Sequence, residues 1–593
     1  MSLRTPSACL GLLALCSFAF ANPIIYVDDS ADAGGDGISW DRAFRSLDEA
    51  LELHLDPFTE IWVAEGVYTP KLNDDETSTF QIPDNVRLYG GFEGDESDLD
   101  DRPDPFDHPT ILNGDIESGT EGDINNIVTI TDASFALLDG FIIESAGGSA
   151  ASPDGGGVLI QDSSVLIRNV AIVSCFAGPT TTNGRGGAIA VFGDSFLQLE
   201  DAHIENCEAP TGGAIFSEAP MQILRVTFED NVAQSTDGGA IALTGQGVST
   251  IFESRFENNF TQNGGGGAIG CLLQRKSTTT ALLIEDCVFI DNAGGNGSFG
   301  GAIAFEGDGL NRISRSRFIN NETPNAGGAV FTDLDTGASE LVIESSFFSG
   351  NRSGFRGGAV YQEGSSDLIV INATISGNEA DGLGGGVFTS SGDCYVVNSI
   401  LWDNNNTNTS GQPRQDQFSF SGGGAPRVIT VDWSRVQNWE FSPVNGSIET
   451  TGEEPGLEQP LGPDGVIGTE DDSALLAPGA SAIDAGNDLW PVNYVSLADL
   501  NFEPRFMDDP GTPNTGEDDG NPGIVDIGAT EFQGDSSSCP GDADGDNAVD
   551  LADLNLVLAN FGQTTSNGDV TDDGLVDLAD LNLVLANFGT TCG

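Results

Sequence analysis

A glycine-rich phrase returns along the middle of the chain at nearly constant intervals, and this regularity constrains the fold more than any other feature. A Gly-Gly pair followed by a small or apolar residue recurs nine times, at intervals of 26 to 34 residues. Periods of this length are typical of solenoids, in which each repeat forms one turn and packs on its neighbours. The second glycine of each pair is at positions 157, 187, 213, 239, 267, 301, 328, 358 and 386.

A second phrase follows each glycine pair, as in "ESRFENN" and "EDCVFIDN", and its apolar and polar residues alternate as in strands. Aligning the phrases gives columns of like residues. One column is aromatic or branched: Ile204, Phe228, Phe256, Phe289, Phe318, Phe348 and Ile375. Three residues later stands an asparagine column: Asn231, Asn259, Asn292, Asn321, Asn351 and Asn378.

These columns predict a right-handed parallel β-helix, in which like residues stack about 4.8 Å apart on successive rungs. A buried asparagine in a tight bend is able to hydrogen-bond its counterparts above and below, and the glycine pair supplies a second bend. A leucine-rich repeat is excluded because its L-x-x-L-x-L frame is absent. A polar column that includes Asp201, Arg225, Glu253, Asp286 and Arg315 is expected to point outward as a charge ladder.

Cysteine takes the place of asparagine at the start of the column, at Cys175 and Cys207. Stacked neighbours of this kind form either a disulfide or a pair of thiols, and we expect buried structural thiols. The sequence does not fix the pairing of Cys271, Cys287 and Cys394.

The first 21 residues have the features of a signal peptide, with Arg4 before the apolar run "CLGLLALCSFAFA". The chain is therefore expected to be secreted and extracellular, and associated with a cell surface. Its 92 Asp and Glu against 21 Lys and Arg give a net charge of −71, which disfavours nucleic acid and anionic membranes. No later run is long and apolar enough for a membrane span.

Residues 22–115 are expected to form an N-terminal cap and the first rungs, and residues 116–410 the regular repeats. A short amphipathic helix is predicted over 46–55, with a capping box of Ser46 and Glu49. It would cover the open end of the β-helix, where an exposed sheet edge invites aggregation.

The body resembles secreted β-helix proteins of the pectin-lyase-like superfamily, close to the repeats of polymorphic outer membrane proteins. The phrases "SAIDAGN", "DLNFEPRF" and "VDIGATEF" in residues 411–533 resemble the terminal segment called choice-of-anchor Q. The resemblance implies the last rungs followed by a segment that precedes sorting modules. It also raises polysaccharide cleavage as an activity.

The sequence contains no clear pattern of catalytic residues, and the catalytic residues therefore stay unknown. The three histidines, His54, His108 and His203, are isolated from one another in sequence. A lyase would need a basic side chain beside a calcium-binding carboxylate cluster, and the arginines of the second phrase fall within the charge ladder. The arginines in question are Arg225, Arg255, Arg315 and Arg317.

Three functions therefore remain open. The first is a non-catalytic cell-surface or matrix protein whose flank binds glycans or surface partners. The second is a polysaccharide lyase or glycoside hydrolase with a divergent site, and the third is a structural spacer or adhesin stalk. Trp402, Trp433 and Trp439 near the last rungs make either a sugar platform or aromatic packing. The acidic loop 462–472, with Asp464, Asp471 and Asp472, either chelates calcium or is a solvated turn.

Residues 534–593 contain one acidic-then-apolar phrase twice, with twelve residues identical at a 27-residue offset. Calcium prefers six to eight oxygen ligands, which a twelve-residue loop offers at positions 1, 3, 5, 7, 9 and 12. The pattern predicts two calcium ions, one in each loop, followed by helices that pack through Leu554, Val557, Leu558 and Phe561 and their repeats. The predicted ligands, with Ala548 and Leu575 through their carbonyls, are Asp542, Asp544, Asp546, Ala548, Asp550, Asp553, Asp569, Thr571, Asp573, Leu575, Asp577 and Asp580.

Aspartate at position 12, with a helix only after each loop, resembles dockerin type I repeats more than a paired EF-hand. The resemblance implies a cohesin-like or other cell-surface receptor, contacted through loop positions 10 and 11. These positions are Leu551 with Ala552 and Leu578 with Ala579, in place of the hydroxylated pair typical of dockerins. Cys539 and Cys592 bracket the repeat and are expected to form a disulfide.

Overall fold

The computed structural model describes the chain from residue 22 to residue 589 with gaps. Described are residues 22–53, 55, 58–70, 77–115, 124–147, 154–178, 184–273, 281–307, 309–334, 339–407, 416–421, 428–438, 451–487, 496–509, 512–516, 525–533, 543, 548–563, 568, 570, 575–576 and 578–589. The expected signal peptide at residues 1–21 and the expected Cys539–Cys592 disulfide therefore lie outside the described residues.

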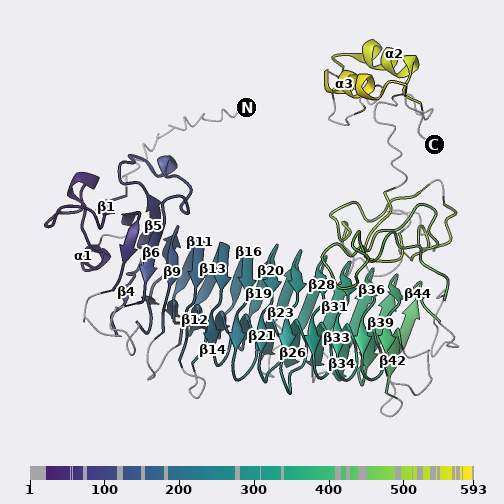
Figure 1. Cartoon of the computed structure of the whole chain (residues 1–593), viewed down its shortest axis with the longest axis horizontal. Coiled ribbons are helices and arrows are strands. Elements are labelled where there is room, and N and C mark those ends of the chain that lie inside the picture. Colours follow the sequence, from purple (N-terminus) through teal and green to yellow (C-terminus); the bar gives the residue numbers. More distant parts are fainter. Residues whose placement is uncertain are drawn as a thin grey trace, which may run out of the picture.

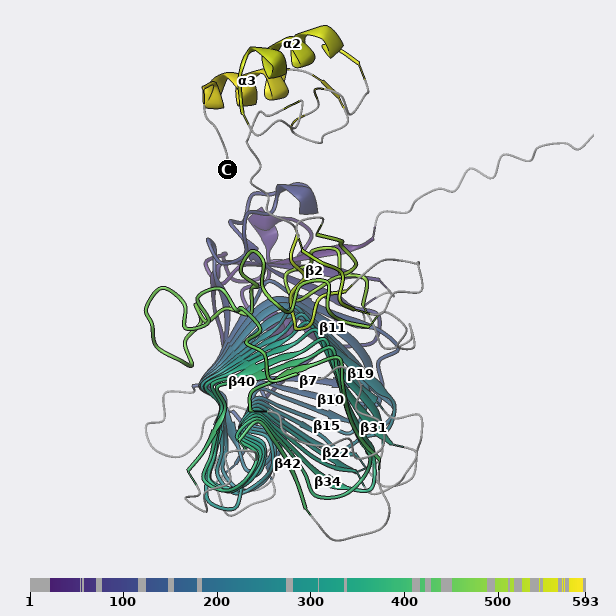
Figure 2. The same cartoon turned by 90° about the vertical axis from the view of Figure 1, so that its right-hand side faces the viewer.

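The body is a right-handed β-helix whose strands pair in parallel with their equivalents one rung away (Figures 1 and 2). Three ladders of 24, 12 and 8 strands form its walls. The predicted β-helix is thus confirmed.

The 24-stranded sheet carries two strands per rung through most of its length. Its strands are β1 Ile24–Val27, β2 Glu60–Ala64, β3 Gly66–Tyr68, β5 Arg87–Phe92, β6 Thr110–Asn113, β8 Ala136–Asp139, β9 Ile142–Glu144, β11 Ser164–Val173, β13 Phe196–Glu205, β16 Met221–Glu229, β19 Val248–Phe252, β20 Arg255–Glu257, β23 Ala281–Glu285, β24 Val288–Ile290, β27 Leu310–Ser314, β28 Arg317–Ile319, β31 Glu340–Glu344, β32 Phe347–Ser349, β35 Asp367–Ile371, β36 Thr374–Ser376, β39 Cys394–Val397, β40 Ile400–Trp402, β43 Ile429–Asp432 and β44 Arg435–Val436.

The other two sheets close the rung. The 12-stranded sheet consists of β4 Phe80–Gln81, β7 Val128–Thr131, β10 Val158–Gln161, β12 Ile189–Phe192, β15 Ile215–Ser217, β18 Ile241–Leu243, β22 Ile269–Leu273, β26 Ile303–Gly307, β30 Val330–Leu334, β34 Val360–Gly364, β38 Val387–Thr389 and β42 Phe418–Phe420. The 8-stranded sheet consists of β14 Glu208–Ala209, β17 Val232–Ala233, β21 Phe260–Thr261, β25 Ala293–Gly294, β29 Glu322–Thr323, β33 Arg352–Ser353, β37 Glu379–Ala380 and β41 Asn405–Asn406.

One rung shows how single residues turn the chain. Glu253 (φ 47°) separates β19 from β20, and Asn258 (φ 54°) begins the bend into β21. Gly266 (φ 72°) then turns the chain into β22. Each corner therefore depends on a residue in the left-handed region, which is uncommon for residues with a Cβ.

The glycine pairs form the bend before the 12-stranded sheet, and the structure corrects two of their positions. Val158 pairs with Ile189, and Val360 pairs with Val387, so the second glycine of the first and last copies is at 156 and 385, rather than 157 and 386. At this second position a side chain has no room, because a Cβ on Gly239 would lie 1.9 Å from the carbonyl oxygen of Gly267.

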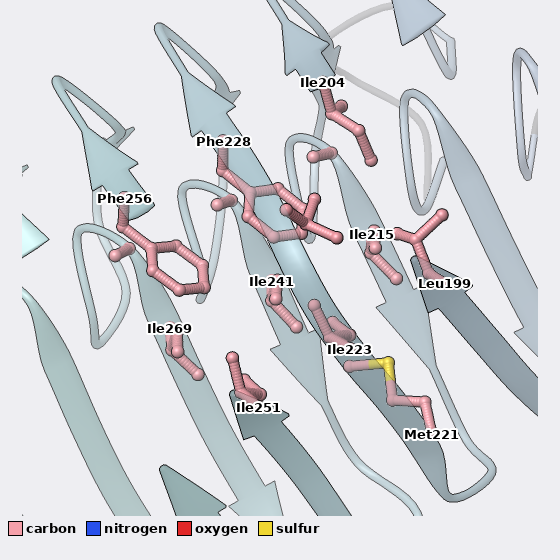
Figure 3. Close-up of a cluster of buried hydrophobic side chains, with 14 of the residues drawn as sticks. Leu199, Ile204, Ile215, Met221, Ile223, Phe228, Ile241, Ile251, Phe256 and Ile269 are labelled. Carbon is pink, nitrogen blue, oxygen red and sulfur yellow. The ribbon is translucent and has the colours of Figure 1, made fainter. Parts of the chain in front are cut away.

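The aromatic column is buried and stacked as predicted. The rings of Phe228, Phe256, Phe289, Phe318 and Phe348 lie nearly parallel, with centroids 4.6 to 4.8 Å apart. Figure 3 shows two of these rings beside the branched residues that fill the interior. Stacking of this kind stabilises the fold by more than the burial of the rings alone would.

The asparagine column is also confirmed as a continuous ladder. In a typical step, the Asn292 carboxamide donates to Asn321 Oδ1 at 3.0 Å and to the Phe256 carbonyl at 2.9 Å. Its oxygen accepts from the Asn259 backbone amide at 3.1 Å. The ladder continues past the predicted positions to Asn404, whose carboxamide donates to Gln417 Oε1 at 2.7 Å. Each side chain thus satisfies backbone groups that the bend leaves unpaired.

The N-terminal cap is present, but its helix is shorter than predicted. Helix α1 is Leu47–Leu51, and the Ser46 hydroxyl caps it by accepting from the Asp48 amide at 3.2 Å, in place of a box with Glu49. Leu47 and Ala50 enter the core of the β-helix. So short a helix is marginal alone, and this packing explains why it forms and why it extends only one turn. The other short helices here are 3-10 helices, η1 Trp40–Arg42 and η2 Leu99–Asp101.

The described parts of residues 451–533 fold back over the outer face of the last rungs, and we call them the strap (Figures 1 and 2). Phe347 of β32 packs against strap residues Ala474, Leu500 and Ala529. Ile400 of β40 packs in a second cluster with further strap residues. The strap therefore covers apolar side chains that point outward from the β-helix.

The C-terminal residues contain two helices, α2 Leu551–Asn560 and α3 Leu578–Asn587, which pack together. We call residues 534–593 the tail. Its core consists of Val549, Val557, Val576 and Val584, which are fully buried. The small helical content predicted for the C-terminus is confirmed.

Candidate functional site

The outward polar column forms the charge ladder that the sequence predicts. Arg225 binds Asp201 with two hydrogen bonds of 2.6 and 2.8 Å, and Arg315 binds Asp286 at 2.7 and 3.0 Å. Arg315 also pairs with Glu285 and donates to Ser496 of the strap at 2.8 Å. These ion pairs account for the presence of both arginines without a catalytic role, and the exposed pair of Arg225 with Asp201 contributes little to stability.

Two more arginines lie where the strap meets the body. Arg255 pairs with Glu257 at 2.8 Å and with Glu470 of the strap at 2.6 Å. Arg317 donates to Asn501 of the strap at 2.9 Å, and burial lowers the pKa of its guanidinium. All four arginines considered as lyase bases are therefore held in structural contacts, and we assign no catalytic role to them.

A buried network holds the strap together, and the sequence did not reveal that its parts converge. Arg505 is fully buried and donates to the carbonyls of Gly528 and Ala529 at 3.0 and 2.6 Å. It also donates to Ser345 at a corner of the β-helix, at 3.1 Å. The Glu531 carboxylate lies 3.6 Å from its Nη1.

Three more carboxylates, those of Asp484, Asp499 and Asp526, lie in the same network and accept backbone amides, Asp484 from that of Asp509 at 3.2 Å. Asp526 accepts from the amides of Asp484 and Phe532 at 2.7 and 2.6 Å, and Glu531 accepts from that of Asp526 at 3.1 Å. Asp499 accepts from the Glu531 amide at 2.8 Å. Burial raises the pKa of Asp484 to about 6 and that of Asp526 to about 7. The phrases "SAIDAGN", "DLNFEPRF" and "VDIGATEF" thus meet in one clasp.

The acidic loop 462–472 rests against the body. Asp472 is buried and accepts from the Ser349 hydroxyl of β32 at 2.5 Å and the Gly468 amide at 2.6 Å. Asp464 and Asp471 are exposed and accept from Val466 and Thr469 of their own loop, at 2.7 and 2.6 Å. Among the described residues, no group of three or more His, Cys, Asp or Glu is placed to hold a metal. The loop therefore anchors the strap to the body through Asp472.

The two described tryptophans near the last rungs, Trp402 and Trp433, take part in packing. Trp433 is 8% exposed, and Trp402 packs against the cluster around Ile400. Trp433 and Arg435 line a cavity of about 380 Å³ between the last rung and the strap. The Arg435 guanidinium donates to Ser481 Oγ at 3.2 Å, and burial lowers its pKa. Trp439 lies outside the described residues.

Between the cap and the strap, the outer faces of β13 and β16 stay uncovered (Figure 1). We call this surface the open flank, and it extends to β20, where Arg255 reaches Glu470 of the strap. Glu205, Glu229 and Glu257 lie in register on its successive rungs. His203 Nε2 lies 3.3 Å from Glu205 and 3.9 Å from Glu229.

Beside the open flank, three successive turns line a depression of about 520 Å³. Asp194, Glu218 and Gln246 contribute polar side chains to it, and Pro220 an apolar one. Phe196, next to Asp194 in the chain, is 38% exposed. Apolar surface beside hydrogen-bonding groups suits an amphipathic ligand such as a sugar.

The tail is built with internal two-fold symmetry. The Gly589 amide after α3 donates to the Val549 carbonyl of the first loop at 2.7 Å, and the Gly562 amide after α2 donates to the Val576 carbonyl of the second loop at 2.7 Å. Each loop is therefore tied to the end of the other helix. The described parts of the two repeats thus make equivalent contacts.

Five of the twelve predicted calcium ligands lie among the described residues: Ala548, Asp550, Asp553, Leu575 and Asp580. Asp553 and Asp580 are fully buried, and they accept from the position-2 amides of their loops, Ala543 at 2.7 Å and Val570 at 2.9 Å. Asp550 caps α2. The predicted ligands outside the described residues are Asp542, Asp544, Asp546, Asp569, Thr571, Asp573 and Asp577.

This donor set fits calcium. A carboxylate at position 12 of a calcium loop is one of the oxygen ligands that such a loop offers. Asp553 and Asp580 are fully buried in a tail that contains no lysine or arginine, so no basic side chain of the tail offsets their charge.

The helices do not bury their whole apolar stripe. Val557 and Val584 are in the tail core, whereas Leu558 and Leu585 are each 53% exposed, which corrects the prediction that they pack between the units. Leu551 is 61% exposed and Leu578 63%, and Ala552 is exposed as well, while the side chain of Ala579 lies outside the described ones. Phe561 and Phe588 are exposed to similar extents. The two halves thus present matching apolar faces.

No described helix is long and apolar enough to cross a membrane. A family model for right-handed β-helix regions matches residues 126–336, and no curated protein matches the chain.

Three solved structures are similar to this chain at low sequence identity. Pectate lyase Pel9A is 12% identical, with a TM-score of 0.33 over 86% of this chain and 97% of its own. XylC in complex with xylose is 10% identical, with a TM-score of 0.35 over 73% and 87%. The GH136 lacto-N-biosidase from Eubacterium ramulus is 12% identical, with a TM-score of 0.27 over 69% and 68%.

Proposed function

We propose that this chain is an exported, non-catalytic cell-surface or matrix protein. Its β-helix presents a flank to glycans or other surface partners, and its tail is a calcium-folded, dockerin-like tether. The observation that carries this proposal is the two-fold tail, with a buried aspartate in each loop and matching apolar faces on its helices. The domains proposed are a signal peptide at 1–21, the β-helix and strap at 22–533, and the tail at 534–593.

Two calcium ions, one in each loop, would neutralise the carboxylates and fix the loop conformation on which the helices depend. Asp553 and Asp580 hold the position-2 amides, and Asp550 caps α2. Thr571 replaces a carboxylate at position 3 of the second loop, so the second site is expected to bind calcium more weakly.

The receptor for the tail would present an apolar surface. Leu551 and Leu578 occupy equivalent exposed positions at the starts of α2 and α3, where dockerins have hydroxylated residues. Clustered exposed apolar residues of this kind commonly mark an interaction surface. Because the halves match, a cohesin-like or other cell-surface receptor would bind in two orientations.

The open flank favours a neutral glycan over an acidic one. Glu205, Glu229 and Glu257 stand in one row, and a chain with a net charge of −71 repels polyuronates. The alternative function, a divergent polysaccharide lyase or hydrolase, draws support from the depression that contains Asp194 and Glu218. The spacer function needs no ligand on the body at all.

Calorimetry and circular dichroism on the full chain test the tether. Calcium should bind at two sites and raise the helical signal, because binding and folding of the tail share one free energy. Asp553→Ala should abolish the first site and Asp580→Ala the second, while Asp464→Ala in the body loop serves as the matched control. The same helical signal in excess chelator, with no heat of calcium binding, would refute the tether.

A glycan array and a lyase assay with the purified chain test the body. Binding of neutral glycans, weakened by Phe196→Ala, and no unsaturated product from pectate or alginate are expected. Steady product formation that is lost in Arg255→Gln would establish a lyase instead. No binding on the array, with the calcium response intact, would favour the spacer.

A further inference from the structure

The asparagine ladder begins beside two stacked cysteines. Val173 pairs with Glu205, and Phe176 with Glu208, so Cys175 and Cys207 lie in register on neighbouring rungs. Both side chains are fully buried. The backbone amide of Cys207 donates to Asn231 Oδ1 at 3.0 Å, which makes Cys207 the first position tied to the ladder.

The thiols make weaker versions of the ladder's hydrogen bonds. Asn231 Nδ2 donates to the Ile204 carbonyl at 2.9 Å, whereas Cys207 Sγ lies 3.7 Å from the equivalent carbonyl, that of Ile172. A thiol is a weak donor and a weak acceptor. Without a carboxamide, the junction between the rungs of Cys175 and Cys207 is tied less firmly than the junctions of the ladder that follow.

We propose that Cys175 and Cys207 are an oxidation site, where a disulfide between neighbouring rungs replaces the missing carboxamide tie. In-register residues of neighbouring parallel strands are about 4.8 Å apart, within the range of about 4.4–6.8 Å between the Cα atoms of a disulfide. In the structure both cysteines are free thiols, and their side chains are hydrogen-bonded to each other. The proposed export would bring the chain into an oxidising compartment, where disulfides persist.

The other described cysteines have no cysteine in register with them. Cys271 of β22 pairs with Leu243 and Phe305 on its neighbouring rungs. Cys394 of β39 pairs with Leu368 and Ile429. The Cys287 amide donates to the hydroxyl of Ser316 on the next rung, in a column of small residues. Cys175 and Cys207 are therefore the matched pair among the described cysteines.

The oxidation proceeds by two thiol–disulfide exchanges with a small-molecule disulfide such as oxidised glutathione. One cysteine thiolate attacks that disulfide, which forms a mixed disulfide and releases one small thiolate. The second cysteine thiolate then attacks the protein-side sulfur, which forms the Cys175–Cys207 bond and releases the other. The two protein thiols lose two electrons and two protons, and the small disulfide is reduced to two thiols.

The timing of this step follows from burial. Burial raises the pKa of the Cys207 thiol well above its usual value, and the thiolate is the reacting form. The exchange therefore takes place before the two rungs close, during folding after export. Once the rungs have closed, the bond is shielded from reductants.

Peptide mapping of the full chain tests the proposal without any variant. The chain is refolded with oxidised and reduced glutathione, unfolded in denaturant with N-ethylmaleimide, digested and analysed by mass spectrometry. We expect a cross-linked peptide that joins Cys175 to Cys207, while Cys271, Cys287 and Cys394 are alkylated. Alkylation of both Cys175 and Cys207 in the oxidised sample, or a bond from either to another cysteine, would overturn it.

Hydrogen exchange measures the consequence of the bond. Amides of β10 to β13 should exchange at least tenfold faster in Cys207→Ser than in the oxidised chain, while Cys287→Ser, the matched control, leaves them unchanged. Equal exchange rates in Cys207→Ser and in the oxidised chain would show that the disulfide does not stabilise the pairing of these rungs. The calcium response of the tail is independent of either outcome.

Discussion

At the residue scale, the body is held by side chains that contact their own equivalents one rung away. The stacked phenyl rings and the carboxamide ladder each repeat one favourable contact many times. The carboxamides matter most where a bend would otherwise leave backbone groups without partners. Each interior asparagine therefore supports three rungs at once.

Replacing Asn292 with alanine should destabilise the body by about 2–4 kcal/mol, because the Phe256 carbonyl and the Asn259 amide would both lose a buried partner. Asn292→Cys should cost less, as cysteine already occupies this column at two rungs. The exposed neighbour of the ladder, Asn405, gives the control Asn405→Ala. Urea denaturation followed by circular dichroism measures the difference, and equal midpoints for Asn292→Ala and the control would contradict the role of the ladder.

The columns could be predicted because repetition makes the signal strong. Nine imperfect copies define the inward and outward positions even where single residues vary. The left-handed corners at Arg225 (φ 54°) and Arg315 (φ 42°) were not foreseen, because residues with a Cβ seldom signal this conformation. The end of the ladder at Gln417 was missed since glutamine departs from the asparagine column.

At the element scale, the strap is the part that sequence reasoning could place only by resemblance. It has no repeat, and its contacts join residues far apart in the chain, such as Arg505 with Ser345. Periodicity carries no information about such contacts. Its buried clasp contains four carboxylates, Asp484, Asp499, Asp526 and Glu531, against one guanidinium, that of Arg505.

The clasp should weaken as pH rises. In the folded chain the pKa of Asp484 is raised to about 6 and that of Asp526 to about 7, so the folded state binds protons more tightly than the unfolded one. The stability contributed by these protons is fully present below about pH 4 and is lost as pH rises through about 6 to 7. Limited proteolysis of residues 451–533 should accelerate between pH 5 and pH 8.

The variant Asp526→Asn checks the origin of this dependence. It should flatten the pH profile of strap proteolysis, and Asp471→Asn in the exposed part of the loop should leave the profile unchanged. An unchanged profile in Asp526→Asn would show that these protons do not control the strap.

At the scale of the whole molecule, uncompensated acidity is the dominant property. Glu306, Asp333 and Glu363 lie in register on successive rungs of the 12-stranded sheet. Burial and the neighbouring Asp237 and Asp333 raise the pKa of Glu306 to about 6. Like charges opposite one another destabilise a sheet.

Glu306→Gln should therefore stabilise the body at pH 8, where the native glutamate is charged. Removing a neighbouring like charge is worth about 1 kcal/mol in water, which corresponds to a rise of about 2 °C in Tm. The gain should shrink at pH 5 and in high salt. Glu470→Gln, which removes an attraction to Arg255, is the opposite control and should not raise Tm. Scanning calorimetry measures both, and no gain from Glu306→Gln at pH 8 would contradict the repulsion.

The division between a repeating middle and two non-repeating ends makes the length of this molecule adjustable. Every rung offers the same edge to the next, so a phrase inserted between the cap and the rungs that the strap contacts extends the wall by about 4.8 Å and leaves both ends unaltered. Each duplication of one repeat would increase the distance between the two ends by the same amount. Selection for the length of the β-helix could thus act on the number of repeats, independently of selection on what either end of the molecule binds.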